Sequence, residues 1–309
     1  MKEGSKEMNR NKITIIGGSG GMGKIFAQIF KRNGFEVTIY ARNEERLEKV
    51  ANELGVNYEI SLQESVLDAD YVMISIPISS TVEMIYEIAP YLKKDAFMFD
   101  ITSLKAEVVK ALDDVQKRHP INTFSIHPMF GPGVRNLVDY NLIFLNLRDY
   151  DDYNAIMDDL IDIFKKEGLK VSFMEDAEYH DKIMALVLGT PHMFNILFLE
   201  LIRISKIPLQ DLMKFTGTTF LLQKIFAESI IQREVEMFGE IEMKNSEFHK
   251  ILSRFQKLVE KYKEIILNQD LSEFEGFFSK GEEYVKDDEH FKKSYNYFYD
   301  FIRRLKKEK

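Results

Sequence analysis

A glycine-rich turn near the N-terminus constrains the fold of this chain more than any other stretch of its sequence. Residues 12–16 form a short, mostly β-branched run typical of a buried strand, and residues 17–23 read Gly-Gly-Ser-Gly-Gly-Met-Gly. Gly18, Gly20 and Gly23 have the spacing G-x-G-x-x-G between that strand and a helix. The first glycine would permit a tight turn, the second would let a pyrophosphate approach the backbone, and the third would let the helix pack on the strand. The alternative is a plain flexible turn.

The pattern predicts a dinucleotide-binding loop whose phosphates lie at the helix N-terminus. The loop residues expected to contact the dinucleotide are Gly18, Ser19, Gly20, Gly21, Met22 and Gly23.

Strands and helices alternate through the first half of the chain. Strands are expected at residues 12–16, 36–40, 71–76, 96–101, 124–127 and 170–173. Asn43 can cap a helix that stops before Gly55, and Ser61 with Glu64 has the spacing of a capping box. A further helix is expected at 150–167. The alternation predicts right-handed crossovers and a Rossmann-like, doubly wound parallel sheet of the α/β class.

The second half shows helical periodicity and no convincing strand, most clearly at residues 247–267. An uncharged run at 183–199 contains Pro191, and we expect either a buried helix or two helices broken there. The expected organisation is an N-terminal extension (1–11), a dinucleotide-binding domain (12–175) and an all-helical substrate and dimerisation domain (176–309).

Composition excludes several classes of protein. The 309 residues contain no cysteine and carry a formal net charge of −8, which argues against disulfides, thiolate metal sites and a nucleic-acid-binding role. Histidines at metal-binding spacing and acidic calcium loops are also lacking, so we expect no metal site. The first 12 residues are polar, and no run suits a membrane span. We expect a cytoplasmic protein without membrane or nucleic-acid partners.

The second strand bears on the choice of cofactor. Its end reads Tyr-Ala-Arg-Asn, with Arg42 where NAD enzymes usually carry an acid for the ribose 2′-hydroxyl. A guanidinium there suits a 2′-phosphate, so NADP is the favoured cofactor. The alternative cofactor is NAD, and with NAD bound Arg42 would merely face solvent. Ile76 and Pro77 also follow a strand, and we expect them to line the dinucleotide because ligands bind beyond the carboxyl ends of such strands.

Two polar residues at strand ends are candidates for chemistry. His127 ends the strand 124–127 and precedes Pro-Met-Phe-Gly-Pro, so its imidazole can act as an acid or base near neutral pH. The alternative is a structural histidine that bonds a loop carbonyl. Ser103, just after the strand 96–101, can cap the helix that runs to Arg118, bond a substrate hydroxyl, or do both.

Four stretches in matching order and spacing make the sequence resemble the prephenate dehydrogenases. They are Gly-Ser-Gly-Gly-Met-Gly at 18–23, Asp-Ile-Thr-Ser-Leu-Lys at 100–105, His-Pro-Met-Phe-Gly-Pro at 127–132, and His180-Asp181 followed by Pro191-His192. The run at 127–132 is the most specific, whereas many dehydrogenases share the glycine loop. The likeness covers nearly the whole chain.

The resemblance implies oxidative decarboxylation of prephenate to 4-hydroxyphenylpyruvate, in tyrosine biosynthesis, with hydride transfer to NAD(P). By position, His127 would be the base for the 4-hydroxyl, with a pKa near that of a free histidine, and Ser103 would orient that hydroxyl. The helical domain would complete the pocket and form a homodimer. His180 and Asp181 would shape the junction between the domains.

The residues for the substrate carboxylates depart from the family pattern. Lys224 falls where family members use an arginine for the ring carboxylate, and it lacks the bidentate fork. Arg203 and Arg233 are the alternatives. His192 is expected at the pyruvyl end, or else as a buried histidine that fills a helix break. Some family members carry a regulatory domain after the helices, which we do not expect in this chain.

Four other functions compete with this interpretation. An arogenate dehydrogenase would act on an amino group where prephenate has a keto group. A 3-hydroxyisobutyrate-type hydroxyacid dehydrogenase or an imine reductase would share the glycine loop and the helical domain, but the run at 127–132 argues against both. A non-catalytic nucleotide sensor would lack the pair of His127 and Ser103.

Overall fold

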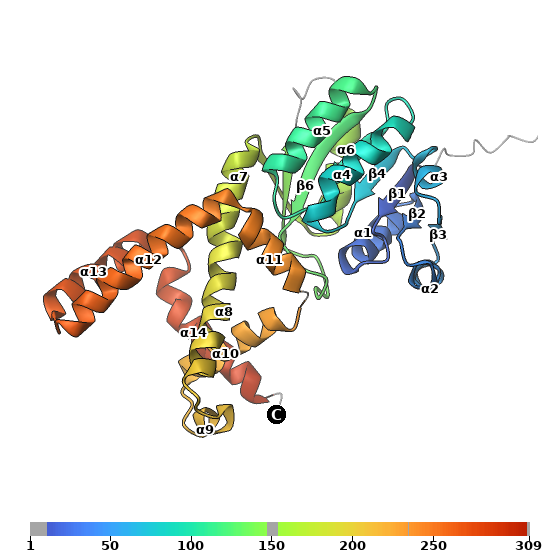
Figure 1. The fold of residues 1–309 in the computed structure, drawn as a ribbon. Helices are drawn as coiled ribbons and strands as arrows, with labels where there is room; N and C mark the ends of the chain where they lie inside the picture. The colour runs from blue at the N-terminus through green and yellow to red at the C-terminus, as the bar shows by residue number, and fades with distance from the viewer. Residues whose placement is uncertain (1–10, 147–153, 234, 308–309) are drawn as a thin grey trace, which may run out of the picture. The chain divides into compact units, whose positions relative to one another are not determined.

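The computed structural model describes residues 11–146, 154–233 and 235–307, in two compact units, Met1–Met184 and Ala185–Lys309 (Figure 1). The expected N-terminal extension therefore lies almost entirely outside the described residues. The first unit is an α/β sheet domain and the second is built of helices, so the expected fold class is confirmed.

The first unit is organised around an eight-stranded sheet with the order β3-β2-β1-β4-β5-β6-β7-β8. The strands are β1 Lys12–Ile16, β2 Glu36–Tyr40, β3 Asn57–Tyr58, β4 Tyr71–Ile74, β5 Phe97–Asp100, β6 Asn122–Pro128, β7 Asn141–Asn146 and β8 Lys170–Met174. Neighbouring strands are parallel except β6 and β7. The carboxyl ends of β1, β2, β4, β5 and β6 therefore meet at one edge.

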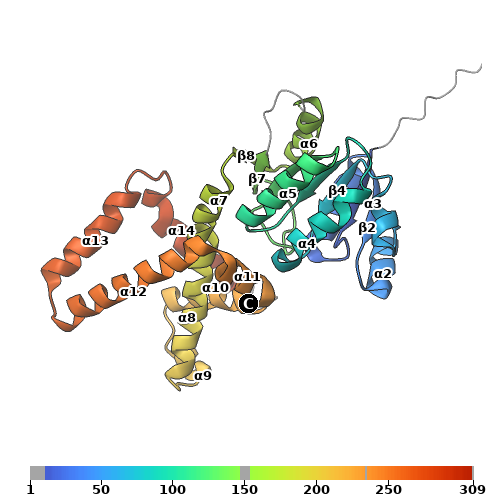
Figure 2. The same cartoon turned by 45° about the horizontal axis from the view of Figure 1, so that its top comes forward.

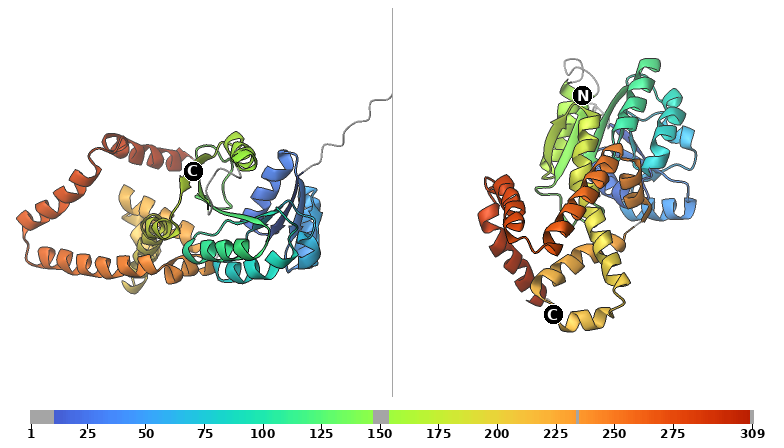
Figure 3. Two further views of the ribbon diagram at one scale, coloured as in Figure 1. Left: turned by 90° about the horizontal axis from the view of Figure 1, so that it is seen from above. Right: turned by 60° about the vertical axis from the view of Figure 1, so that its left-hand side comes forward.

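Helices cover both faces of this sheet, as Figures 2 and 3 show. One hydrophobic core joins the sheet to α1 (Gly21–Arg32), α2 (Glu44–Leu54) and α6 (Asn154–Lys166). A second core joins the other face to α3 (Leu62–Val66), α4 (Ile78–Ile88) and α5 (Ala106–Arg118). The short 3-10 helix η1 (Ala89–Tyr91) follows α4, and α7 (Ala177–Met184) closes the unit.

Several helix ends fall where the sequence predicts them. The Asn43 side chain accepts a hydrogen bond from the backbone N–H of Arg46, and Gly55 ends α2 in the left-handed conformation with φ 62°. Ser61 likewise accepts from the N–H of Glu64. Each contact satisfies a backbone group that the helix leaves unpaired.

Two strands are missing from the sequence prediction, and one connection differs from it. β3 has only two residues, too few for a periodic signal. β7 follows β6 without an intervening helix, and because parallel neighbours need a crossover it pairs antiparallel. The sheet is therefore parallel, as expected, except for the one antiparallel pair that β7 forms with β6. Residues 150–153 of the expected helix 150–167 lie outside the described residues.

The second unit contains helices and no strand in its described part, as expected. After the π-helical turn η3 (Ala185–Gly189), the helices are α8 Thr190–Ile204, α9 Leu209–Lys214, α10 Thr218–Ile231, α11 Val235–Lys244, α12 Ser246–Leu267, α13 Leu271–Val285 and α14 Phe291–Lys307. Phe248 of α12 packs on η3, where a Cβ at Gly189 would lie 2.6 Å from its ring.

The uncharged run at 183–199 is not broken at Pro191 and is only partly buried, contrary to expectation. It continues through η3 into α8, and Pro191 lies in the first turn of α8. Proline has no N–H to donate, and the wider π turn just before it lets the helix continue. Leu186, Val187, Phe194, Ile196 and Leu197 are 38–53% exposed. By length and composition alone, the helix Ala177–Ile204 is long and apolar enough to cross a membrane, which is weak evidence for a span.

Candidate active site

The glycine loop packs tightly against neighbouring strand ends. Gly17 has φ 83°, and a Cβ there would lie 2.1 Å from the carbonyl oxygen of Ser75, at the end of β4. The N–H groups of Gly17 and Gly18 donate to the Tyr40 carbonyl at 2.8 and 3.1 Å. A Cβ at Gly23 would lie 2.4 Å from the Gly17 oxygen, so helix and turn approach closely as predicted. The glycine of the turn with a positive φ is Gly17, which directly precedes the G-x-G-x-x-G motif.

The loop fits the pyrophosphate of a dinucleotide. α1 starts at Gly21 with no side-chain cap and no acidic residue in its first turn, so its first N–H groups and its positive dipole end remain available to an anion. Ser19 is buried in the turn, and Met22 packs on the core. The loop thus offers backbone donors with no competing carboxylate.

The other residues expected at the dinucleotide lie at two neighbouring strand ends. Arg42 follows β2, is exposed and forms no ion pair within the described part of the chain. Ile76, half-buried, and Pro77, the N-cap residue of α4, follow β4. Because β1 lies between β2 and β4, these residues flank the glycine loop on both sides.

The loop that follows β6 reaches the glycine loop. A Cβ at Gly21 would lie 2.6 Å from the Cβ of Pro132, the last residue of the His-Pro-Met-Phe-Gly-Pro run. The structure therefore brings together the two stretches that predicted dinucleotide binding and chemistry separately.

His127 belongs to a chain of buried side chains. It is 3% exposed, and its Nδ1 lies 3.0 Å from Nε2 of His180 on α7. The His180 Nδ1 lies 2.9 Å from the Asp181 carboxylate. The His127 Nε2 has no hydrogen-bond partner among the described residues. We expected His180 and Asp181 at a domain junction, and the structure places both in the first unit, behind His127.

Burial lowers the pKa of His127 well below 6.5, and the positive charge of Lys105 and the neighbouring His180 lower that pKa further. The pKa of His127 therefore lies below that of a free histidine, contrary to expectation. Burial also lowers the pKa of His180, although the bond to Asp181 opposes the effect. Both imidazoles are neutral at neutral pH.

A buried ion pair beside His127 was missed from the sequence. Lys105 and Asp100 have fully buried side chains, and the Lys105 Nζ lies 2.7 Å from an Asp100 oxygen. The same Nζ donates to the carbonyl of Ile126 at 2.8 Å, and Asp100 also accepts from Thr102 and Ser125. Burial lowers the pKa of Lys105, against the attraction of Asp100. Both residues lie in the stretch 100–105, and its resemblance to the family was the signal that could have identified them from the sequence.

Ser103 does not cap the helix that follows it, contrary to one expectation. α5 starts at Ala106, and Asp181 accepts the N–H groups of Lys105 and Ala106 at 2.8 and 2.9 Å. The Ser103 hydroxyl is half-buried and has no hydrogen-bond partner in the described chain. It therefore remains available to a ligand, at the end of the strand next to β6.

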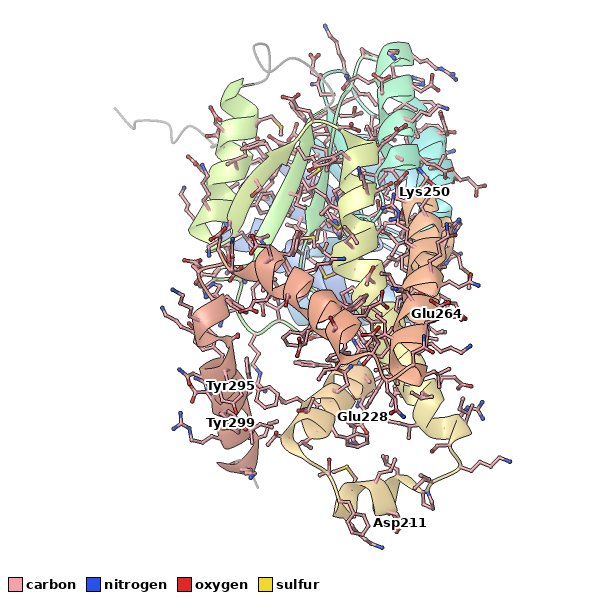
Figure 4. All side chains as sticks on the ribbon, turned by 90° about the vertical axis from the view of Figure 1, so that its left-hand side faces the viewer. Asp211, Glu228, Lys250, Glu264, Tyr295 and Tyr299 are labelled. Carbon is pink, nitrogen blue, oxygen red and sulfur yellow. The ribbon has the colours of Figure 1, made fainter. Side chains whose placement is uncertain are left out.

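The expected substrate residues of the helical unit lie on two packed helices. His192 of α8 packs edge-on against Phe238, and its buried Nδ1 has no partner among the described residues. Burial lowers the pKa of His192 to about 4. The Lys224 ammonium of α10 lies 2.6 Å from Glu228, one turn along the same helix. Figure 4 labels Glu228. Gln223 donates to Asn195 at 3.0 Å and joins the two helices.

The two alternative cations lie on the surface. Arg203 forms an ion pair with Glu200, and Arg233 is exposed. No group of three or more potential metal ligands occurs among the described residues.

Comparison with known proteins is consistent with this site. A family model described as "Prephenate dehydrogenase, nucleotide-binding domain" matches residues 26–173, and a model described as "Prephenate dehydrogenase, dimerization domain" matches residues 176–280. The "Probable arogenate/prephenate dehydrogenase" of Methanocaldococcus jannaschii is 29% identical over 262 residues, 85% of this chain. The chain spans only 58% of that relative's length.

The "T-protein" of Haemophilus influenzae is 25% identical over 289 residues, which are 92% of this chain and 70% of that protein. Among solved structures, prephenate dehydrogenase from A. aeolicus, in complex with hydroxyphenyl propionate and NAD+, has the same fold. Its TM-score is 0.73 at 20% identity, and the match covers 91% of this chain and 99% of that one.

Proposed function

Because the chain belongs to the prephenate dehydrogenase family, we propose that it converts prephenate to 4-hydroxyphenylpyruvate and carbon dioxide with reduction of NAD(P)+. The single observation that carries this proposal is the buried His127 imidazole with an unpartnered Nε2, at the strand end beside the glycine loop. Family membership argues against the hydroxyacid dehydrogenase and imine reductase alternatives. The intact His127 and Ser103 argue against a non-catalytic sensor.

The dinucleotide is held by the residues predicted for it. The N–H groups at the start of α1 bind the pyrophosphate, with Gly18, Ser19, Gly20, Gly21, Met22 and Gly23 forming the loop. The unpaired Arg42 favours a 2′-phosphate and hence NADP. When bound, the nicotinamide supplies the hydride acceptor.

His127 receives the proton of the 4-hydroxyl at Nε2 as hydride leaves C4, and the open Ser103 hydroxyl orients that group. The ring carboxylate then leaves as carbon dioxide, its bonding electrons enter the ring, and the ring becomes aromatic. The phenolate oxygen recovers a proton from His127. The reaction as a whole consumes and releases no proton, so the His127 imidazole can serve both proton-transfer steps.

Two residues of the helical unit bind the carboxylates in this proposal. His192 donates to the pyruvyl end, and Lys224, released from Glu228, binds the ring carboxylate. We further propose a cytoplasmic homodimer that forms through the helical unit, since residues 176–280 match the family's dimerization domain.

The test is His127→Asn, assayed at 340 nm with prephenate. Binding of the dinucleotide and of prephenate should be nearly unchanged, because the base is needed only as the hydroxyl becomes a carbonyl. Turnover should fall by roughly 10²–10⁴-fold. His290→Asn, at an exposed histidine, is the matched control and should keep parental turnover.

If His127→Asn keeps its turnover and loses only prephenate affinity, His127 is a binding residue and the base lies elsewhere. The same assay with arogenate, and with NAD in place of NADP, distinguishes the substrates and cofactors. Equal or faster turnover of arogenate would overturn the assignment of prephenate.

A further inference from the structure

We infer that His180 and Asp181 are positioning residues that fix the tautomer of His127, so that its Nε2 is unprotonated and faces the reacting hydroxyl. The inference rests on the proposed function, because it takes His127 as the base. It assigns a chemical role to two residues whose sequence pattern suggested only a domain junction.

The Asp181 carboxylate accepts hydrogen bonds from two backbone donors and lies beside His180. One of its oxygens accepts the Lys105 N–H at 2.8 Å and the other accepts the Ala106 N–H at 2.9 Å, at the N-terminal end of α5. These two donors and the positive helix end anchor the Asp181 carboxylate. An ionised carboxylate only accepts hydrogen bonds, so the His180 Nδ1, 2.9 Å away, must carry a proton.

The protonation of His180 then decides that of His127. A neutral His180 with its proton on Nδ1 has a lone pair on Nε2, so the His127 Nδ1 at 3.0 Å must donate. A neutral His127 with its proton on Nδ1 has a lone pair on Nε2, the atom without a partner. A charged His180 would reverse the second bond and place the His127 proton on Nε2, where the ring could no longer act as a base.

The charged groups around the pair favour the neutral form of His180. Its side chain is fully buried, and the Lys105 ammonium on the neighbouring loop disfavours a second positive charge. Asp181 and, more distantly, Asp100 oppose this, and burial is the largest of these effects. Lys105 and His180 likewise disfavour a positive charge on His127.

Two substitutions at His180 separate positioning from packing. His180→Phe fills the space but offers no acceptor to His127. His180→Gln can accept from the His127 Nδ1–H through its amide oxygen and donate to Asp181 through its amide nitrogen. Neither change removes the Asp181 carboxylate that caps α5. Thermal unfolding and dinucleotide binding of both variants should stay close to those of the parent.

We expect kcat of His180→Phe to fall by about tenfold or more, and by less than that of His127→Asn, with KM for prephenate nearly unchanged. His180→Gln should retain most of the parental kcat. Nitrogen-15 NMR of the imidazoles gives a readout that a purely structural role would not change. In the parent, the His127 proton should lie on Nδ1, and in His180→Phe a population with the proton on Nε2 should appear.

The outcomes distinguish this inference from the proposed function. If His127→Asn keeps its turnover, the proposed function fails. If His127→Asn loses turnover but His180→Phe keeps it, or if the NMR shows the Nδ1 tautomer in both proteins, only the positioning role is overturned. An equally large loss of kcat in His180→Phe and in His180→Gln would also contradict the positioning role, provided that both variants fold.

Discussion

Arg42 is the residue that we expect to decide between the two nicotinamide cofactors. It stands exposed at the end of β2 without an ion pair among the described residues, so a 2′-phosphate would meet a free guanidinium. We predict that Arg42→Ala weakens NADP binding by about 1.5–3 kcal/mol, the cost of a lost charge-assisted hydrogen bond, and leaves NAD binding nearly unchanged. Titration of each cofactor by fluorescence measures both effects. Equal constants for the two cofactors in the parent and the variant would contradict the NADP assignment.

His192 makes the stability of the helical unit depend on pH. Its pKa is lowered to about 4 by burial, whereas the unfolded chain has an ordinary histidine pKa of 6.5. Between pH 6.5 and about 4 the unfolded state binds the proton more tightly, so the folded state loses stability as the pH falls through that window. We predict that His192→Phe has a smaller difference in melting temperature between pH 8 and pH 5 than the parent. An unchanged difference would show that His192 does not titrate on unfolding.

At the scale of the element, the turn between β1 and α1 depends on a residue without a side chain. Gly17 and Gly34 both have a positive φ, 83° and 87°, but only Gly17 lies against another strand, since nothing lies within 4 Å of a Cβ at Gly34. An alanine at Gly34 meets only the backbone strain, about 1–2 kcal/mol. An alanine at Gly17 must also displace the carbonyl of Ser75.

We therefore predict that Gly17→Ala destabilises the protein more than Gly34→Ala in urea unfolding. Only Gly17→Ala should also weaken dinucleotide binding, because the turn presents the start of α1. Equal losses of stability in the two variants, with cofactor binding intact, would show that the close approach of the loop to β4 is not needed.

At the scale of the whole molecule, the helical unit exposes many large apolar side chains. A groove of about 610 Å³ between α8, α11 and α12 is lined by Ile196, Leu197, Leu252 and Val259. Exposed apolar surface of this extent is typical of a subunit interface. Because residues 176–280 match a dimerization domain, we expect a second copy of the chain to cover this groove.

We predict that Leu197→Asp yields a monomer, or a much weaker dimer, at micromolar concentration in light scattering. A buried, unpaired carboxylate at an interface is strongly unfavourable. Leu67→Asp is the matched control, because Leu67 is 45% exposed and Leu197 is 47% exposed, but Leu67 lies in the sheet unit. A parent protein that is already monomeric, or equal dissociation of both variants, would contradict this interface.

Local sequence patterns alone predicted the α/β class of the first unit, although not its strands β3 and β7, and the helical character of the second unit. The glycine turn, the strands β1 and β2, the cap at Asn43 and the end of α2 at Gly55 all fell as predicted. Such features depend on the backbone preferences and apolar periodicity of a few adjacent residues, which the sequence displays directly.

Only the tertiary structure decided which distant side chains meet. His127 and His180 are 53 positions apart, and the bond between them exists because α7 packs beside the end of α5. The burial of Lys105 against Asp100, and with it the lowered pKa of His127, likewise depends on how β5, β6 and α5 pack. The sequence predicted a base at residue 127. The identity of the nitrogen that accepts the proton follows from hydrogen bonds that no local pattern encodes, because they depend on how separate elements pack.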